Sequence, residues 1–194
     1  MKNACEGVLY PINAASQIQL KDQPCAPETL PILGSNLKAI EVPHKAWLYC
    51  KEELENTFSY LKKHNEKTSR LFVLAPLHKG PIAFDDKFKV YCPEKGILKA
   101  SDWQINLDTP QEIKALNFVE ANDDVCTEEH SLEILGPFIY KAYPKAKVCY
   151  LLAPGKKEEI CEITSVIGRL YQNSIIFLSN NEQTNCAQMW MGNL

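Results

Sequence analysis

The sequence lacks a membrane-spanning run and a strong charge bias. Its longest apolar stretches, such as LFVLAPL at 71–77, are far shorter than the run of about 20 residues that crosses a bilayer. The N-terminal residues contain no long apolar region, so no signal peptide is expected. The net charge of -3 gives neither the basic surplus typical of nucleic-acid binding nor an acidic tail. We therefore expect neither a membrane nor a nucleic acid as partner.

Nucleotide-binding and serine-hydrolase motifs are also missing. Gly34, Gly80 and Gly155 are isolated, and neither GxGxxG nor GxxxxGK[ST] occurs, so no loop is built to surround phosphates. The sequence also contains no GxSxG, the strand-to-helix turn that carries the nucleophile of many hydrolases. These absences exclude the common signatures of dinucleotide-dependent, P-loop and serine-hydrolase enzymes.

The eight cysteines are scattered, without a CxxC pair. A chain of 194 residues that is 45% hydrophobic can form one sizeable core and does not need disulfides for stability. Cys149 and Cys161 lie in apolar contexts that suit buried thiols. The cysteine pattern therefore predicts a reducing compartment, and we expect a cytoplasmic protein.

The hydrophobic pattern predicts an α/β fold. Residues 51–63 and 156–172 carry apolar side chains at helical spacing. Four short apolar runs between turn signals are typical of strands buried on both faces: Leu37–Val42, Leu71–Ala75, Lys147–Leu152 and Ser174–Ser179. Because strands alternate with helices, we expect a three-layer αβα arrangement around a mostly parallel central sheet.

Other segments complete this single-domain interpretation of residues 1–194. Thr109, Pro110 and Glu112 predict a helix start, with Thr109 as the cap. Phe84–Pro93 is a candidate extra strand or hairpin. Residues 1–36 are enriched in proline and have few periodic signals, which predicts an irregular N-terminal arm packed on the domain.

Two predicted strands end alike. AIEVPH ends at His44 and LFVLAPLH ends at His78, so in each a proline stops the strand and a histidine follows within two residues. Ligands of open α/β sheets bind outside the carboxyl ends of the strands, and imidazole is a common ligand of iron, copper and zinc. The two histidines are therefore candidate metal ligands. The alternative is two loop histidines with ordinary hydrogen bonds.

A third motif strengthens the metal interpretation. EHSLEILGPF at 129–138 places a polar triplet before an apolar helical stretch, and Ser131 is a candidate cap for that helix. Together with PHKAW at 43–47 and APLH at 75–78, it resembles the MEMO family, the B component of the AmmeMemoRadiSam system. That family is similar to the extradiol dioxygenase subunits that bind non-haem iron. The resemblance covers residues 37 to about 180.

The resemblance implies roles for individual residues. His44 and His78 match the first two metal-site histidines, and Glu129 and His130 match an acid and a histidine that face the same cleft. We expect His130, with Glu129, to serve as an acid–base or supporting group. The cofactor implied is Fe(II), with copper or zinc as alternatives, and an absent metal is a further alternative.

The sequence departs from the family pattern after the last predicted strand. Gln183 occupies the position of the third ligand, where the family has cysteine or histidine, so Cys186, Glu182 and Gln183 remain alternatives, with Cys186 preferred. Lys45 replaces a small residue behind His44 and would oppose metal binding unless it points outward. The chain also ends at Leu194, where the family continues, which predicts a missing lid or wall.

Two functional hypotheses follow from the resemblance. The first is a metal-dependent, non-haem-iron-type oxidation of an unknown small organic substrate in a pocket at the strand ends. The second is a non-catalytic binding or scaffold protein that works with a radical SAM or AMMECR-type partner. A homodimer that supplies the missing wall in trans is an expectation under either hypothesis.

Overall fold

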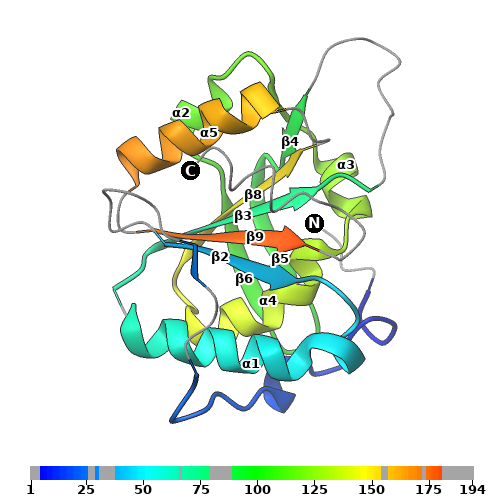
Figure 1. The fold of residues 1–194 in the computed structure, drawn as a ribbon. Coiled ribbons are helices and arrows are strands. Elements are labelled where there is room, and N and C mark those ends of the chain that lie inside the picture. The colour runs from blue at the N-terminus through cyan, green and yellow to red at the C-terminus, as the bar shows by residue number, and fades with distance from the viewer. Residues whose placement is uncertain are drawn as a thin grey trace.

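A nine-stranded sheet forms the centre of the protein (Figure 1). The computed structural model describes residues 5–25, 29–30, 38–65, 67–78, 89–153, 157–171 and 174–180. Four adjacent parallel strands build the middle of the sheet, in the order β2 (Lys38–Pro43), β9 (Ile175–Asn180), β3 (Arg70–Pro76) and β8 (Lys147–Ala153). These are the four strands that the apolar runs predict.

Shorter strands extend the sheet on both sides. They are β1 (Thr29–Leu30), antiparallel to β2, then β4 (Val90–Cys92), antiparallel to β8, and β7 (Val119–Ala121), parallel to β4. A hairpin of β5 (Lys95–Lys99) and β6 (Gln104–Asp108) joins β8 through β6. Of the predicted strand or hairpin at Phe84–Pro93, only β4 and its immediate neighbours lie within the described residues. The β5–β6 hairpin was not predicted.

Helices cover both faces of the sheet, so the predicted three-layer αβα arrangement is confirmed. In Figure 1, α1 (Trp47–His64) and α4 (Ser131–Ala142) lie on one face, and α2 (Gln111–Lys114) and α5 (Lys157–Leu170) lie on the other. Two apolar clusters, one on each face, account for the burial of the central strands. Among the described residues, no helix has both the length and the apolar character that crossing a membrane requires.

The helix α4 is the central element of the first layer. Its residue Phe138 packs on Trp47 with ring centroids 4.8 Å apart, and on Phe58 at 5.6 Å. Phe58 in turn stacks on Phe177 of β9 at 5.0 Å. The indole N–H of Trp47 donates to the carbonyl of Ile134 in α4 at 3.3 Å. This aromatic column connects the start of α1, the interior of α4 and the sheet.

Gly136 allows α4 to approach the β5–β6 hairpin. A methyl group added at Gly136 would lie 2.5 Å from two ring carbons of Trp103, and the Trp103 side chain is itself buried. The close packing of an indole ring on the helix backbone therefore requires glycine here. Pro137, the next residue, lies inside the helix and removes one backbone donor from it. Gly136 and Pro137, which a helix would ordinarily avoid, therefore lie where the Trp103 ring covers the backbone of the helix.

The predicted start of α2 was wrong in detail. The residue that precedes the helix is Pro110, which has no side-chain hydrogen-bonding group, and Thr109 lies one position too early to be the cap. Thr109 is instead buried, with 1% of its surface exposed. The sequence pattern located the helix but placed its first residue one position too early.

The segment at residues 5–25 lies along α1, α4 and the β5–β6 turn, and contains one 3-10 turn at Ala15–Gln17. Carboxylates of the domain accept backbone N–H groups of this segment: Asp102 from Ala15 and Ser16, and Glu55 from Gln19. Because Glu55 is buried, the N–H group of Gln19 is satisfied by the domain rather than by water.

The cysteines within the described part of the chain are free thiols: Cys5, Cys25, Cys50, Cys92, Cys126 and Cys149. Cys149 is fully buried, as predicted, and burial raises its pKa. The side chain of Cys161 lies outside the described residues.

Candidate metal centre

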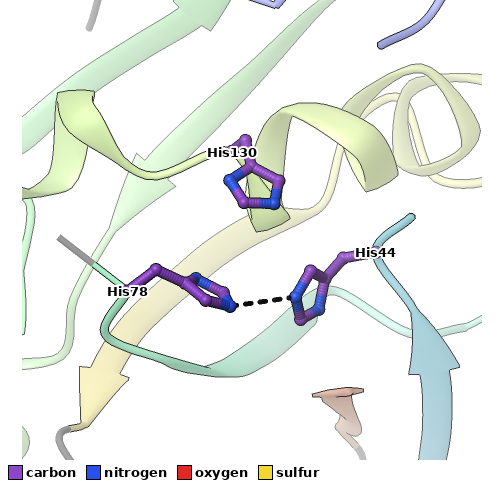
Figure 2. A group of neighbouring side chains, drawn as sticks. All are labelled: His44, His78 and His130. Atoms are coloured by element: carbon purple, nitrogen blue, oxygen red, sulfur yellow. Dashed lines mark hydrogen bonds between the residues drawn. The ribbon is translucent and has the colours of Figure 1, made fainter. Parts of the chain in front are cut away.

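Three histidines meet at the carboxyl edge of the parallel strands (Figure 2). His44 directly follows β2, and His78 lies two residues after β3. His130 directly precedes α4, which begins at Ser131. Because β2 and β3 run parallel, the residues that follow them lie at the same edge of the sheet. The strand-end prediction for His44 and His78 therefore corresponds to their observed positions.

The three imidazole rings face one another. One ring nitrogen from each histidine can be chosen so that all three atoms lie within 4.8 Å of one another. The Nε2 atoms of His44 and His78 are 3.4 Å apart, the contact drawn as a dashed line in Figure 2. The ring of His130 completes the group, with its centroid 5.5 Å from that of His44 and 5.1 Å from that of His78.

His44 is the innermost of the three. It is 1% exposed, and its Nδ1 lies 2.9 Å from the hydroxyl oxygen of Ser179 in β9. Burial lowers the pKa of His44 from its ordinary value of 6.5 to about 3, and the nearby His78 and His130 lower it as well. Near neutral pH His44 is therefore an uncharged imidazole, the form that binds metals.

Glu129 holds His78 at two points. One carboxylate oxygen accepts the backbone N–H of His78 at 2.5 Å, and the other lies 2.9 Å from its Nδ1. Glu129 is 1% exposed, whereas the side chain of His78 is 22% exposed. The carboxylate thus orients the ring so that Nε2 faces the other histidines, which is the arrangement of a carboxylate–histidine pair at a metal site.

A two-residue connection places Glu129 and His130. Helix α3 (Asp123–Glu128) is followed by Glu129, whose backbone is extended, and α4 follows His130. The predicted capping of α4 by Ser131 was wrong, because Ser131 is the first helical residue and its hydroxyl lies 2.6 Å from that of the buried Tyr150 in β8. This buried pair fixes the start of α4 to the sheet directly beside the site.

The histidine group fits a metal ion. Two nitrogens bound to one tetrahedral ion at ~2.0–2.1 Å are separated by about 3.3–3.4 Å, and the Nε2 atoms of His44 and His78 have this separation. Neutral imidazoles suit zinc, copper and iron, whereas magnesium and calcium prefer oxygen ligands. The donor set therefore favours a transition metal.

The sequence-predicted residues fall into two groups. The structure brings together His44, His78, Glu129 and His130, whereas Cys186, Glu182 and Gln183 lie outside the described residues. Lys45, the substitution behind His44, is partly buried. Sequence reasoning treated His130 as an acid–base or supporting group and did not consider Ser179. The position of the His130 ring depends on the α3–α4 connection, and that of the Ser179 hydroxyl depends on the pairing of β9 with β2. The sequence carries no short motif for either feature.

Comparison with known proteins identifies the family of the chain. A family model described as Memo-like protein matches residues 2–179. The chain belongs to the Memo-like protein family. The matched range contains the three histidines described above, together with Glu129 and Ser179, and it ends before Cys186. A search of curated proteins found no match.

Proposed function

We propose that this Memo-like protein binds one transition-metal ion through His44, His78 and His130. The observation that carries the proposal is the convergence of three imidazoles, with the Nε2 atoms of His44 and His78 at a separation that suits a shared ion. Two further contacts support the proposal. Ser179 lies beside Nδ1 of His44 and Glu129 beside Nδ1 of His78, so the Nε2 atom of each ring faces the site.

Fe(II) is the first metal to test, with copper and zinc as alternatives. The family resemblance implies iron, and a bound iron ion would supply non-haem oxidation chemistry toward a small organic substrate. The residues of the chain would bind and orient: His44 and His78 through Nε2, and His130 as the third imidazole. Glu129 would set the orientation and basicity of His78, because both of its oxygens are engaged by that residue. The sequence suggested an acid–base or supporting role for Glu129, and we propose the supporting one.

Metal content of the untagged protein, purified without oxygen, tests the proposal. We expect about one equivalent of iron, copper or zinc in the wild type, or after reconstitution with ferrous iron, and loss of that metal in a His44→Ala/His78→Ala variant. His64→Ala is the matched control, since His64 is an exposed histidine at the end of α1. Equal metal content in the wild type and the double variant would place any bound ion elsewhere.

A wild-type protein without metal, even after reconstitution, would refute the metal site. The second hypothesis would then apply, in which the Memo-like fold serves as a binding protein for a radical SAM or AMMECR-type partner. Co-purification with such a partner, unchanged by the two histidine substitutions, would be the expected result of that hypothesis.

A further inference from the structure

We propose that the Ser179 hydroxyl lets His44 exchange tautomer between the metal-free and the metal-loaded protein. In the metal-free state Ser179 would donate to Nδ1 of His44, and in the loaded state it would accept from it. Ser179 is thus a positioning residue that acts through His44. This inference rests on the proposed metal site and goes beyond it, because it assigns the ring protons of His44 and His78.

The tautomer of His78 follows from its partner. Glu129 Oε2 lies 2.9 Å from Nδ1, and an ionised carboxylate has only acceptor oxygens. The ring proton of a neutral His78 is therefore on Nδ1, and its Nε2 carries a lone pair. The second oxygen of Glu129 accepts the backbone N–H of the same residue, which fixes the carboxylate relative to the ring. His78 is consequently set for metal binding in the metal-free protein.

The tautomer of His44 follows from that of His78. The two Nε2 atoms are 3.4 Å apart, and two lone pairs facing each other at this distance would repel. A proton on Nε2 of His44 removes the conflict, because it is donated to Nε2 of His78. A neutral ring has one proton, so Nδ1 of His44 is then an acceptor. Ser179, 2.9 Å away, is the donor that satisfies it in this buried position.

Metal binding requires the opposite tautomer. His44 must present an unprotonated Nε2, so its proton must be on Nδ1, and the partner of Nδ1 must accept. The Nε2 proton is given up to water and a proton from water is taken up at Nδ1, so the ring stays neutral and His44 releases no net proton. A hydroxyl can serve as donor or acceptor by rotating its hydrogen, whereas a carboxylate or a carbonyl can only accept. Serine therefore suits both states of the ring.

The two histidines thus differ in their preparation for a metal. His78 has an acceptor-only partner and is held in one tautomer. The partner of His44 is a hydroxyl that can donate or accept, so in the metal-free protein His44 can donate a hydrogen bond to His78. That hydrogen bond keeps the two close imidazoles compatible, beside the buried ring of His44, until an ion binds.

NMR of protein labelled with ¹⁵N-histidine tests the tautomers directly, since protonated and unprotonated ring nitrogens differ widely in shift. Zinc is the probe, because it is diamagnetic. In the wild type we expect His44 to carry its proton on Nε2 without metal and on Nδ1 with zinc, while His78 keeps its proton on Nδ1 in the metal-free state. A proton on Nδ1 of His44 in both states would overturn the proposal.

Zinc affinity of Ser179 variants provides the second measurement. Loss of a group that orients a metal-binding histidine typically weakens affinity by ~10–100-fold, and we expect this for Ser179→Ala. Ser179→Thr keeps the hydroxyl and should restore affinity and the tautomer exchange. Ser59→Ala is the matched control, because Ser59 is a buried serine hydrogen-bonded within α1 and to Lys21.

The outcomes separate this inference from the proposed function. A wild type that takes no zinc, iron or copper would refute the metal site itself. A wild type that binds zinc, together with a Ser179→Ala variant of equal affinity and unchanged tautomers, would refute only the role of Ser179. A Ser179→Ala variant that is weaker, with Ser179→Thr restored and Ser59→Ala unchanged, would support it.

Discussion

Acid should destabilise the metal-free protein through His44. The pKa of His44 is about 3 in the folded protein and about 6.5 in the unfolded chain. Because the folded pKa is the lower one, the unfolded chain takes up the proton first as the pH falls. The stability that the neutral, buried ring allows is fully present above pH 6.5 and is lost progressively as the pH falls toward 3.

The size of the effect follows from the two pKa values. At about 1.4 kcal/mol per pH unit, the full difference corresponds to about 5 kcal/mol. Between pH 7 and pH 5 the unfolded chain becomes almost fully protonated at this residue while the folded ring stays neutral. That interval alone should lower the free energy of unfolding by about 2 kcal/mol.

Urea unfolding at pH 7 and pH 5, with a chelator present, measures this loss. His44→Gln removes the titrating ring and keeps a polar side chain, so the variant should lose about 2 kcal/mol less than the wild type over the same interval. His64→Gln, at an exposed position, controls for the removal of one histidine. Equal losses in the wild type and in His44→Gln would refute the reasoning that His44 is held neutral by burial.

Three further predictions test the packing and the support of the site. Gly136→Ala forces a methyl group against the Trp103 ring and should lower the free energy of unfolding by about 1–3 kcal/mol. Gly168→Ala in α5, where the methyl group meets open space, should raise it by about 0.5–1 kcal/mol. Thermal unfolding of both variants checks the contrast, and an equal effect would contradict it. Glu129→Gln keeps the shape of the side chain but removes the charge that His78 faces. Zinc affinity, measured by competition titration, should therefore fall by ~10–100-fold. An unchanged affinity would contradict a supporting role for Glu129. Ser131→Ala removes the hydroxyl that contacts the buried Tyr150 hydroxyl, which then keeps only its hydrogen bond with the backbone of Leu132, and should cost about 1–3 kcal/mol in urea unfolding. An unchanged free energy of unfolding would contradict this account.

The sequence predicts the central sheet well because its strands are buried on both faces and are therefore nearly continuous apolar runs. The same property locates His44 and His78, since a proline and a polar residue stand out directly after such a run. The β5–β6 hairpin was missed because β6 alternates exposed and buried residues over a short length. Such a pattern is weaker than a continuous apolar run.

Details of the site depended on tertiary contacts that local rules do not contain. The predicted caps Thr109 and Ser131 are good capping residues by type, yet Thr109 is buried and Ser131 is bonded to Tyr150 in a different element. In the sequence Ser179 is only the polar end of a predicted strand, and its partner His44 is 135 positions away in the chain. Only the pairing of β9 with β2 brings the two residues together.

The anchoring of the N-terminal segment has a practical consequence for every metal measurement proposed above. The backbone N–H of Cys5 donates to the buried carboxylate of Glu133, three residues along α4 from His130, a rise of only about 4.5 Å along the helix. An oligohistidine tag fused before Met1 would be separated from that anchor by only four residues. It could supply its own imidazoles to the same ion and imitate a high-affinity centre. Purification through a tag without histidine, or complete removal of the tag, is therefore a condition for interpreting metal stoichiometry in this protein.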